Sequence, residues 1–344
     1  MDEVGARPGR VRASLRAIAF VLGAGAVSWA WSEVGFWAHF RADDAPAGWV
    51  LTWLMYSLAA AVALRVLRRW PGDDLPRLVL VGSLYGWVVE GVVASTVYGA
   101  PPFTIVWTGV AWHGLLTVVV GWLLLPRALV ADGRRRWLVP AAVGVAWGVW
   151  SAGWWAATPD AGQDAAVPDV ASYALFVVVV SAAAAVGYAV MHACAPRGAD
   201  LTSRLGLAVV LLLLGVWGVL VVVVAIPWAP ALLGLLVALA ILSLRRLGPP
   251  ARDDLPLGFE PGLPAGRLGP LVLVPVVAVA TYTALLPLAP GEPGSGAMYA
   301  VIVGIIVVLS LAGTVALGWA LWVAWRRRRP AVAEVSGSRA AGAR

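Results

Sequence analysis

The chain has few charged side chains and a single cysteine. Only 12% of its 344 residues are charged, whereas acidic and basic residues make up about 25% of a typical soluble domain. The single cysteine, Cys194, excludes an internal disulfide and a cysteine-based metal cage. No phosphate-binding loop, nucleophile elbow or zinc-protease helix motif occurs, so the sequence predicts no metal and no cofactor.

Lysine is absent, and all 25 basic residues are arginine. In a chain that is rich in alanine, glycine, valine and proline, we interpret this as the coding bias of a GC-rich bacterial genome. The net charge of +7 does not indicate a nucleic-acid partner, because the arginines lie in short clusters between apolar blocks and no soluble basic domain exists to hold them.

Long apolar runs dominate the sequence. Hydrophobic residues make up 61% of the chain, and the mean hydropathy is +0.86. Blocks of roughly 20 apolar residues match the hydrocarbon thickness of a bilayer, and the alternation typical of barrel strands is missing. The sequence therefore predicts an all-α polytopic membrane protein in a lipid bilayer. We expect ten helices near residues 15–39, 49–67, 77–98, 104–126, 137–157, 170–193, 204–226, 229–245, 268–289 and 297–325.

Arginine segregates to the N-terminus, to every second connection and to the C-terminal tail. The intervening connections are nearly free of it. Because arginine favours the cytoplasmic side, this pattern predicts a multi-pass protein of the bacterial plasma membrane with both termini in the cytoplasm. The arginine-rich start and the apolar run from Ala17 also fit a signal peptide. We expect the segment to be retained as the first helix, because it continues into Trp29, Trp31 and Glu33.

Polar content divides the chain. Residues 1–136 hold helices 1–4 and a candidate polar site, and residues 137–246 form an apolar scaffold of helices 5–8. A Pro/Gly-rich cytoplasmic loop at 247–267 precedes helices 9 and 10 at 268–329. Residues 330–344 have no apolar periodicity and are expected to be disordered.

Three ionisable residues lie well inside the predicted spans, where charge is costly. Glu33 is on helix 1, Glu90 on helix 3 and His113 on helix 4. At 1.5 Å of rise per residue they lie roughly 10, 14 and 14 Å below the outer ends of their helices. Glu90 and His113 therefore share one depth on adjacent helices, although depth does not decide whether they face each other. Glu33 is nearer the outer surface and is expected to reach water.

A carboxylate beside an imidazole can hold or pass a proton, because imidazole titrates near neutrality. The same pair could act as general base and acid on a lipid-borne substrate, or it could simply tie two helices together. Tyr56, Trp107 and Thr108 are the nearby polar groups that could join it. At the outer surface, His39, Asp43 and Asp44 could hold a metal ion, but such loop residues more often face water.

Three functions are compatible with these features. The first is a transporter of an unknown small molecule, linked to protons through Glu90 and His113. Ten helices with both ends inside resemble the ground plan of drug/metabolite-type exporters. That resemblance stops at topology, and the unequal polar content of the two halves counts against a symmetric transporter. The second is an intramembrane enzyme acting on a lipid or polyprenyl-linked substrate at the outer face. The third is a scaffold or accessory subunit.

Overall fold

The computed structural model describes residues 6–41, 44–70, 75–157, 167–195, 204–248, 259, 263–288 and 296–326. Within these ranges the chain is helical and contains no strand. Asp43, most of the 247–267 loop and the C-terminal tail lie outside the described residues.

The described residues form ten successive helical segments, called spans below. The first is built from α1 (Ala6–Ser28), η1 (Trp29–Val34) and α2 (Gly35–Trp37), and the second is α3 (Pro46–Arg69). The third joins α4 (Leu75–Val88) to η2 (Val89–Val93), with a short turn, η3 (Thr96–Tyr98), after it. The fourth joins η4 (Ile105–Leu124) to α5 (Leu125–Val130). The remaining six are α6 (Arg135–Ala157), α7 (Val170–Cys194), α8 (Arg204–Gly218) with η5 (Val219–Val223), α9 (Ala229–Arg246), η6 (Ala265–Val272) with α10 (Leu273–Leu285) and η7 (Leu286–Leu288), and α11 (Gly296–Arg326).

Each span agrees with a predicted helix to within several residues, apart from the first, whose helix begins at Ala6 rather than near residue 15. Among the described residues, nine helices are long and apolar enough to cross a membrane. α6 is not among them, although it has 23 residues and packs along α10. A bilayer offers the backbone no hydrogen-bond partners, so apolar blocks of this length satisfy their peptide groups as helices. The protein is therefore an all-α, multi-pass membrane protein.

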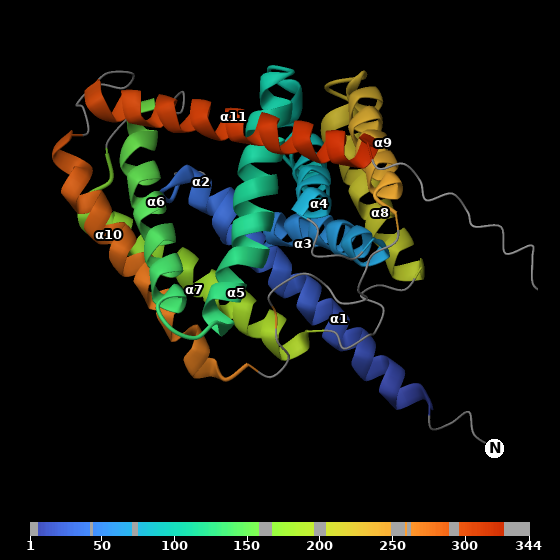
Figure 1. Cartoon of the computed structure of the whole chain (residues 1–344), viewed down its shortest axis with the longest axis horizontal. Coiled ribbons are helices and arrows are strands. Elements are labelled where there is room, and N and C mark those ends of the chain that lie inside the picture. Colours follow the sequence, from blue (N-terminus) through green and yellow to red (C-terminus); the bar gives the residue numbers. More distant parts are fainter. Residues whose placement is uncertain are drawn as a thin grey trace, which may run out of the picture.

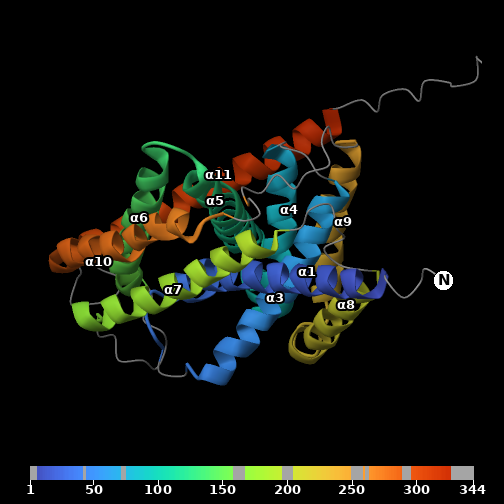
Figure 2. The ribbon, with the colours of Figure 1, turned by 90° about the horizontal axis from the view of Figure 1, so that it is seen from below.

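The third span, α4 with η2, lies at the centre of the bundle. It packs against η4, α3, α9 and α11, and 89% of its most apolar stretch is buried. α11 crosses over α4, η4 and α6 (Figure 1), but only 11% of its most apolar stretch is buried. α1 lies between α3 and α7, as the view from below also shows (Figure 2). Peripheral helices therefore present apolar side chains outward, and polar groups on α4 and η2 are enclosed.

Glycines set the closest helix contacts. A Cβ added at Gly82 would lie 2.8 Å from the carbonyl oxygen of Gly114, so α4 and η4 touch backbone to backbone. Gly144 and Gly148 play the same part between α6 and α10, with 2.7 and 2.6 Å to the carbonyl oxygens of Val274 and Ala278. Small residues four apart permit this approach in membrane helices.

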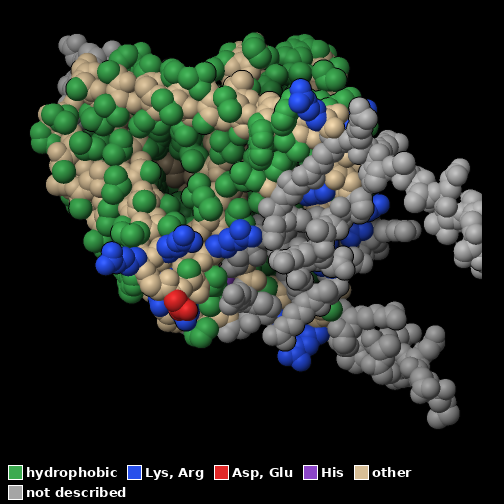
Figure 3. Space-filling view, viewed as in Figure 1, with side chains coloured by type: hydrophobic (Ala, Val, Ile, Leu, Met, Phe, Trp, Pro, Cys, Tyr) green, Lys and Arg blue, Asp and Glu red, His purple; other side chains and the backbone are tan. Residues whose placement is uncertain are grey.

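Arginines join helix ends that the sequence placed on one side of the membrane. Arg16, near the middle of α1, donates to the carbonyl of Ala193 at the end of α7 at 3.0 Å. Arg77 donates to the carbonyl of Leu247 beyond α9 at 3.0 Å, and Arg267 pairs with Asp132 at 2.9 Å. On the face shown in Figure 3, arginines gather along the lower and right margin. These contacts tie α1 to α7, α4 to the end of α9, and η6 to the turn before α6.

Candidate functional site

Each of the three predicted ionisable residues lies in a π-helical segment. Glu33 is in η1, Glu90 in η2 and His113 in η4, whereas η5, the remaining π-helical segment of the described chain, carries no ionisable side chain. π-helical turns occur frequently at functional sites, because the wider backbone re-aims side chains. The π-helical backbone therefore occurs at the same three residues that the sequence singled out, because ionisable groups are costly inside a membrane and these three lie deep in their helices.

Glu90 and His113 face each other. The Nε2 atom of His113 and the Oε1 atom of Glu90 share a hydrogen bond across the contact between η2 and η4. Both side chains are buried, with relative exposures of 6% for Glu90 and 1% for His113. Glu90 Oε2 and His113 Nδ1 have no hydrogen-bond partner within the described part of the chain. The pair thus retains one free acceptor position and one free ring nitrogen for a proton, a water molecule or a ligand.

Glu33 on η1 and Tyr56 near the middle of α3 form a second polar pair. The Tyr56 hydroxyl donates to Glu33 Oε2 at 2.7 Å, and the Trp37 indole lies 3.4 Å from Glu33 Oε1. Glu33 also lines a cavity of about 120 Å³, whose lining includes the exposed residues Ala45 and Gly48. Glu33 itself is half-buried, and its predicted access to water stays a prediction.

Two tyrosines connect these pairs. The rings of Tyr56 and Tyr85 each lie 6.1 Å from the imidazole of His113, centroid to centroid. Glu33 is close enough to both Glu90 and His113 to interact with them electrostatically. Glu33, Tyr56, Tyr85, Glu90 and His113 therefore form one polar cluster across helices 1–4. Sequence reasoning missed Tyr85, although a tyrosine five residues before Glu90 within the same predicted helix was a usable signal.

The two other predicted members lie outside this cluster. Trp107 packs against Trp112 and Trp150, at 5.9 and 6.1 Å between ring centroids. The Thr108 hydroxyl donates back to the Thr104 carbonyl at 2.9 Å within its own helix. The helical spacing that brought them close to His113 in sequence turns their side chains toward other neighbours.

Buried tryptophans act as hydrogen-bond donors to the backbone of helix 1. The indoles of Trp112, Trp147 and Trp150 donate to the carbonyls of Ser32, Gly35 and Phe36 at 2.9–3.0 Å. The last carbonyls of a helix have no intrahelical partner, and lipid supplies none. These indoles therefore donate hydrogen bonds to carbonyls at the C-terminal end of the first span and do not anchor it in the headgroup region.

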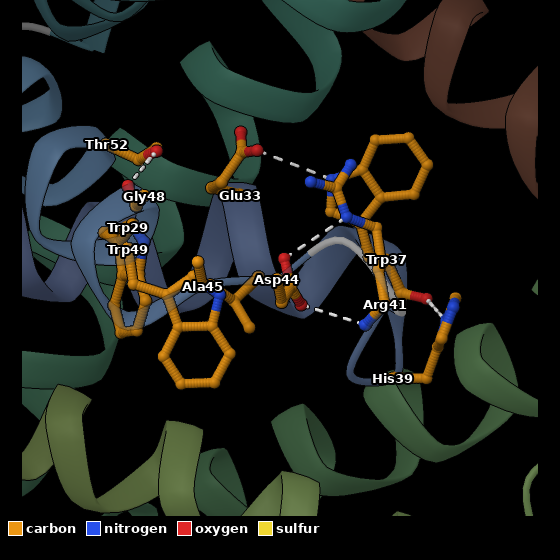
Figure 4. A pocket seen from close by; sticks show the side chains of 11 residues that line it. Trp29, Glu33, Trp37, His39, Arg41, Asp44, Ala45, Gly48, Trp49 and Thr52 are labelled. Carbon is orange, nitrogen blue, oxygen red and sulfur yellow. Dashed lines mark hydrogen bonds and ion pairs between the residues drawn. The ribbon is translucent and has the colours of Figure 1, made fainter.

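The outer loop residues also satisfy backbone groups. His39 Nδ1 donates to the Trp37 carbonyl at 2.6 Å, and both carboxylate oxygens of Asp44 accept from Arg41. Among the described residues no group of three potential ligands is placed to hold a metal ion. Figure 4 shows these side chains around the cavity, with Glu33 on one side and Arg41 and Asp44 between it and His39.

The comparisons with known proteins identify no relative of this chain. The chain matches no family model, no curated protein and no solved structure. Its function is therefore argued from the site.

The cluster can hold and move protons. A carboxylate hydrogen-bonded to an imidazole exchanges a proton over the distance of one hydrogen bond. The Tyr56 hydroxyl donates to Glu33 Oε2, and the Tyr56 ring lies 6.1 Å from the imidazole of His113, centroid to centroid.

Proposed function

We propose that the protein is a proton-linked transporter of the bacterial plasma membrane, with both termini in the cytoplasm. The observation that carries the proposal is the buried Glu90–His113 pair, in direct contact at the centre of the bundle. Ionisable groups inside a membrane are costly and mark ion or proton pathways when they are retained.

The wider arrangement supports a pathway rather than an isolated link between helices. Glu33 lines the outer cavity and accepts a hydrogen bond from Tyr56. The Tyr56 ring in turn lies 6.1 Å from the His113 imidazole, centroid to centroid. A pair that only tied helices together would need neither a cavity nor intermediate hydroxyl groups. Helices 5–10 then form the scaffold, since the acidic residues within described spans lie on helices 1 and 3.

An enzyme acting on a lipid is the second candidate, and it is less well supported. Glu90 and His113 do not line the outer cavity. The cavity, at about 120 Å³, is also below the several hundred cubic ångströms of typical ligand pockets. A larger apolar cavity of about 560 Å³ between α1, α3 and α8 does not include Glu90 or His113 in its lining either, so neither cavity gives a lipid headgroup a path to the pair.

The test uses purified protein in liposomes that enclose a pH-sensitive dye. A pH gradient is imposed, and a panel of small cations, anions and neutral solutes is added outside. The proposal expects one class of solute to change the rate of proton movement in the native protein. Glu90→Gln should abolish that change. The control is Asp132→Asn, which removes an exposed carboxylate on the turn before α6 and should respond like the native protein. An identical response from native protein and Glu90→Gln would contradict the proposal.

A further inference from the structure

The outer cavity has the lining of a site for a small organic cation. Three indoles, from Trp29, Trp37 and Trp49, form much of its wall, and two carboxylates, Glu33 and Asp44, face it together with one guanidinium, Arg41. With both carboxylates ionised and His39 neutral, the lining has a formal charge of −1. Aromatic faces and an unbalanced carboxylate are the two features that attract ammonium groups.

The chain itself places a cation against this wall. The guanidinium of Arg41 lies 4.7 Å from the centre of the Trp37 ring. The backbone N–H of Arg41 donates to Asp44 Oδ2 at 2.9 Å, and Arg41 Nε lies 3.4 Å from Oδ1. Asp44 therefore pairs with Arg41, and the second carboxylate, Glu33, gives the described lining its net negative charge. Figure 4 shows Arg41 joined to Asp44 and Glu33 joined to Trp37 by dashed lines.

The cavity also holds an unused hydrogen-bond donor. Trp29 lines it and is 8% exposed, and its Nε1 atom has no hydrogen-bond partner within the described chain. Buried indole N–H groups are usually paired. A ligand or water molecule in the cavity is in a position to accept this hydrogen bond.

We infer that this cavity binds a small alkylammonium ion, with its positive charge at Glu33 and its alkyl groups against the indoles. The inference rests on the proposed function for one point only, that the bound cation is transported in exchange for protons. Glu33 links the two events, because it lines the cavity and accepts a hydrogen bond from Tyr56, whose ring lies 6.1 Å from the imidazole of His113. A cation at Glu33 and a proton on Glu33 exclude each other.

Binding is measured first, with native protein in lipid nanodiscs and tetramethylammonium chloride as the probe in ligand-observed NMR. tert-Butanol, a neutral molecule of similar shape, and acetate, an anion, are the comparison probes. We expect tetramethylammonium to bind at least tenfold more tightly than either. Equal binding of tetramethylammonium and tert-butanol, or preferred binding of acetate, would overturn the inference.

Variants then locate the site. Glu33→Gln should weaken binding of tetramethylammonium at least tenfold. Trp49→Leu should weaken it several-fold, whereas Trp49→Phe keeps an aromatic ring and should retain most of it. Asp132→Asn removes an exposed carboxylate far along the chain and should bind like the native protein. Gel filtration and circular dichroism identify any variant that fails to fold, and retained affinity in Glu33→Gln contradicts the assignment.

The two proposals fail separately. If no tetramethylammonium binds but proton movement still depends on Glu90, the cation site is wrong and the proton-linked function stands. If the cation binds at Glu33 without any proton exchange, the site stands and the transport proposal is wrong.

Discussion

Gly86 on α4 lies directly against Gly109 on η4. A Cβ added at Gly86 would come within 1.8 Å of the Gly109 carbonyl oxygen and 2.9 Å of the His113 Cβ. One helical turn further along, Glu90 reaches His113. The absence of a side chain at position 86 is thus what lets the two helices come close enough for their ionisable side chains to meet.

Gly86→Ala should separate these helices. A contact of 1.8 Å with backbone cannot be relieved by rotating a side chain, so we expect a loss of stability of at least about 1–3 kcal/mol and a broken Glu90–His113 hydrogen bond. Gly304→Ala on α11, where a Cβ meets nothing within 4 Å, should leave stability unchanged or slightly raised. Thermal unfolding of both variants in detergent measures the difference, and equal melting temperatures would contradict the prediction.

Glu90 and His113 should behave as one unit. We expect Glu90→Gln and His113→Gln each to reduce proton movement by at least about 100-fold. The double variant should be no worse than either single variant, because removing one partner already ends the exchange. A double-mutant cycle in dye-loaded liposomes measures this. Additive losses would indicate that the two side chains act separately.

Tyr56→Phe should slow the delivery of protons while leaving the bundle folded. The change removes the hydroxyl that donates to Glu33 at 2.7 Å and keeps the ring beside His113. We expect the rate of proton movement to fall about tenfold or more, with the affinity for tetramethylammonium reduced less than in Glu33→Gln. Tyr299→Phe, on the exposed side of α11, is the matched control and should transport at the native rate.

Trp112→Phe should destabilise the outer end of helix 1. Phenylalanine keeps most of the ring packing but leaves the buried Ser32 carbonyl without the indole donor at 3.0 Å. Interhelical hydrogen bonds in membranes are worth about 0.6 kcal/mol on average, and a stranded carbonyl raises the loss to about 1–2 kcal/mol. Trp319→Phe on the exposed face of α11 should cost less. Unfolding by denaturant compares the two, and a similar loss in both would show that the hydrogen bond contributes nothing.

Asp169 should make the stability of α7 depend on pH in the acid range. It is the N-cap of α7, and hydrogen bonds from the Ser172 hydroxyl and backbone lower the pKa of its carboxyl group below the ordinary value. A lowered pKa in the folded state means that the ionised cap stabilises the protein above the unfolded-state pKa. That stabilisation is lost as the pH falls through the folded-state pKa.

Two variants separate the cap from its charge. Asp169→Ala should lower the melting temperature at neutral pH more than Asp169→Asn, because asparagine still accepts the backbone hydrogen bonds. The gap between native protein and Asp169→Asn should close at acid pH. A gap that persists at acid pH would contradict the role of ionisation.

The number, type and order of the helices were determined by the sequence alone. Twenty apolar residues in a bilayer have one way to satisfy their backbone, so the blocks beginning near residues 49, 77 and 104 became helices within a few residues of the prediction. The shared depth of Glu90 and His113 also followed from the sequence, because rise per residue and a short connection fix depth.

Rotation about each helix axis was decided only by tertiary packing. It turned Glu90 toward His113, brought Tyr85 into the cluster and turned Trp107 and Thr108 away from it. Helix periodicity within one chain segment cannot show which face meets which neighbour. That depends on where small residues such as Gly86 permit contact, on the π-helical turns that shift side-chain direction, and on the carbonyls that the tryptophans must satisfy.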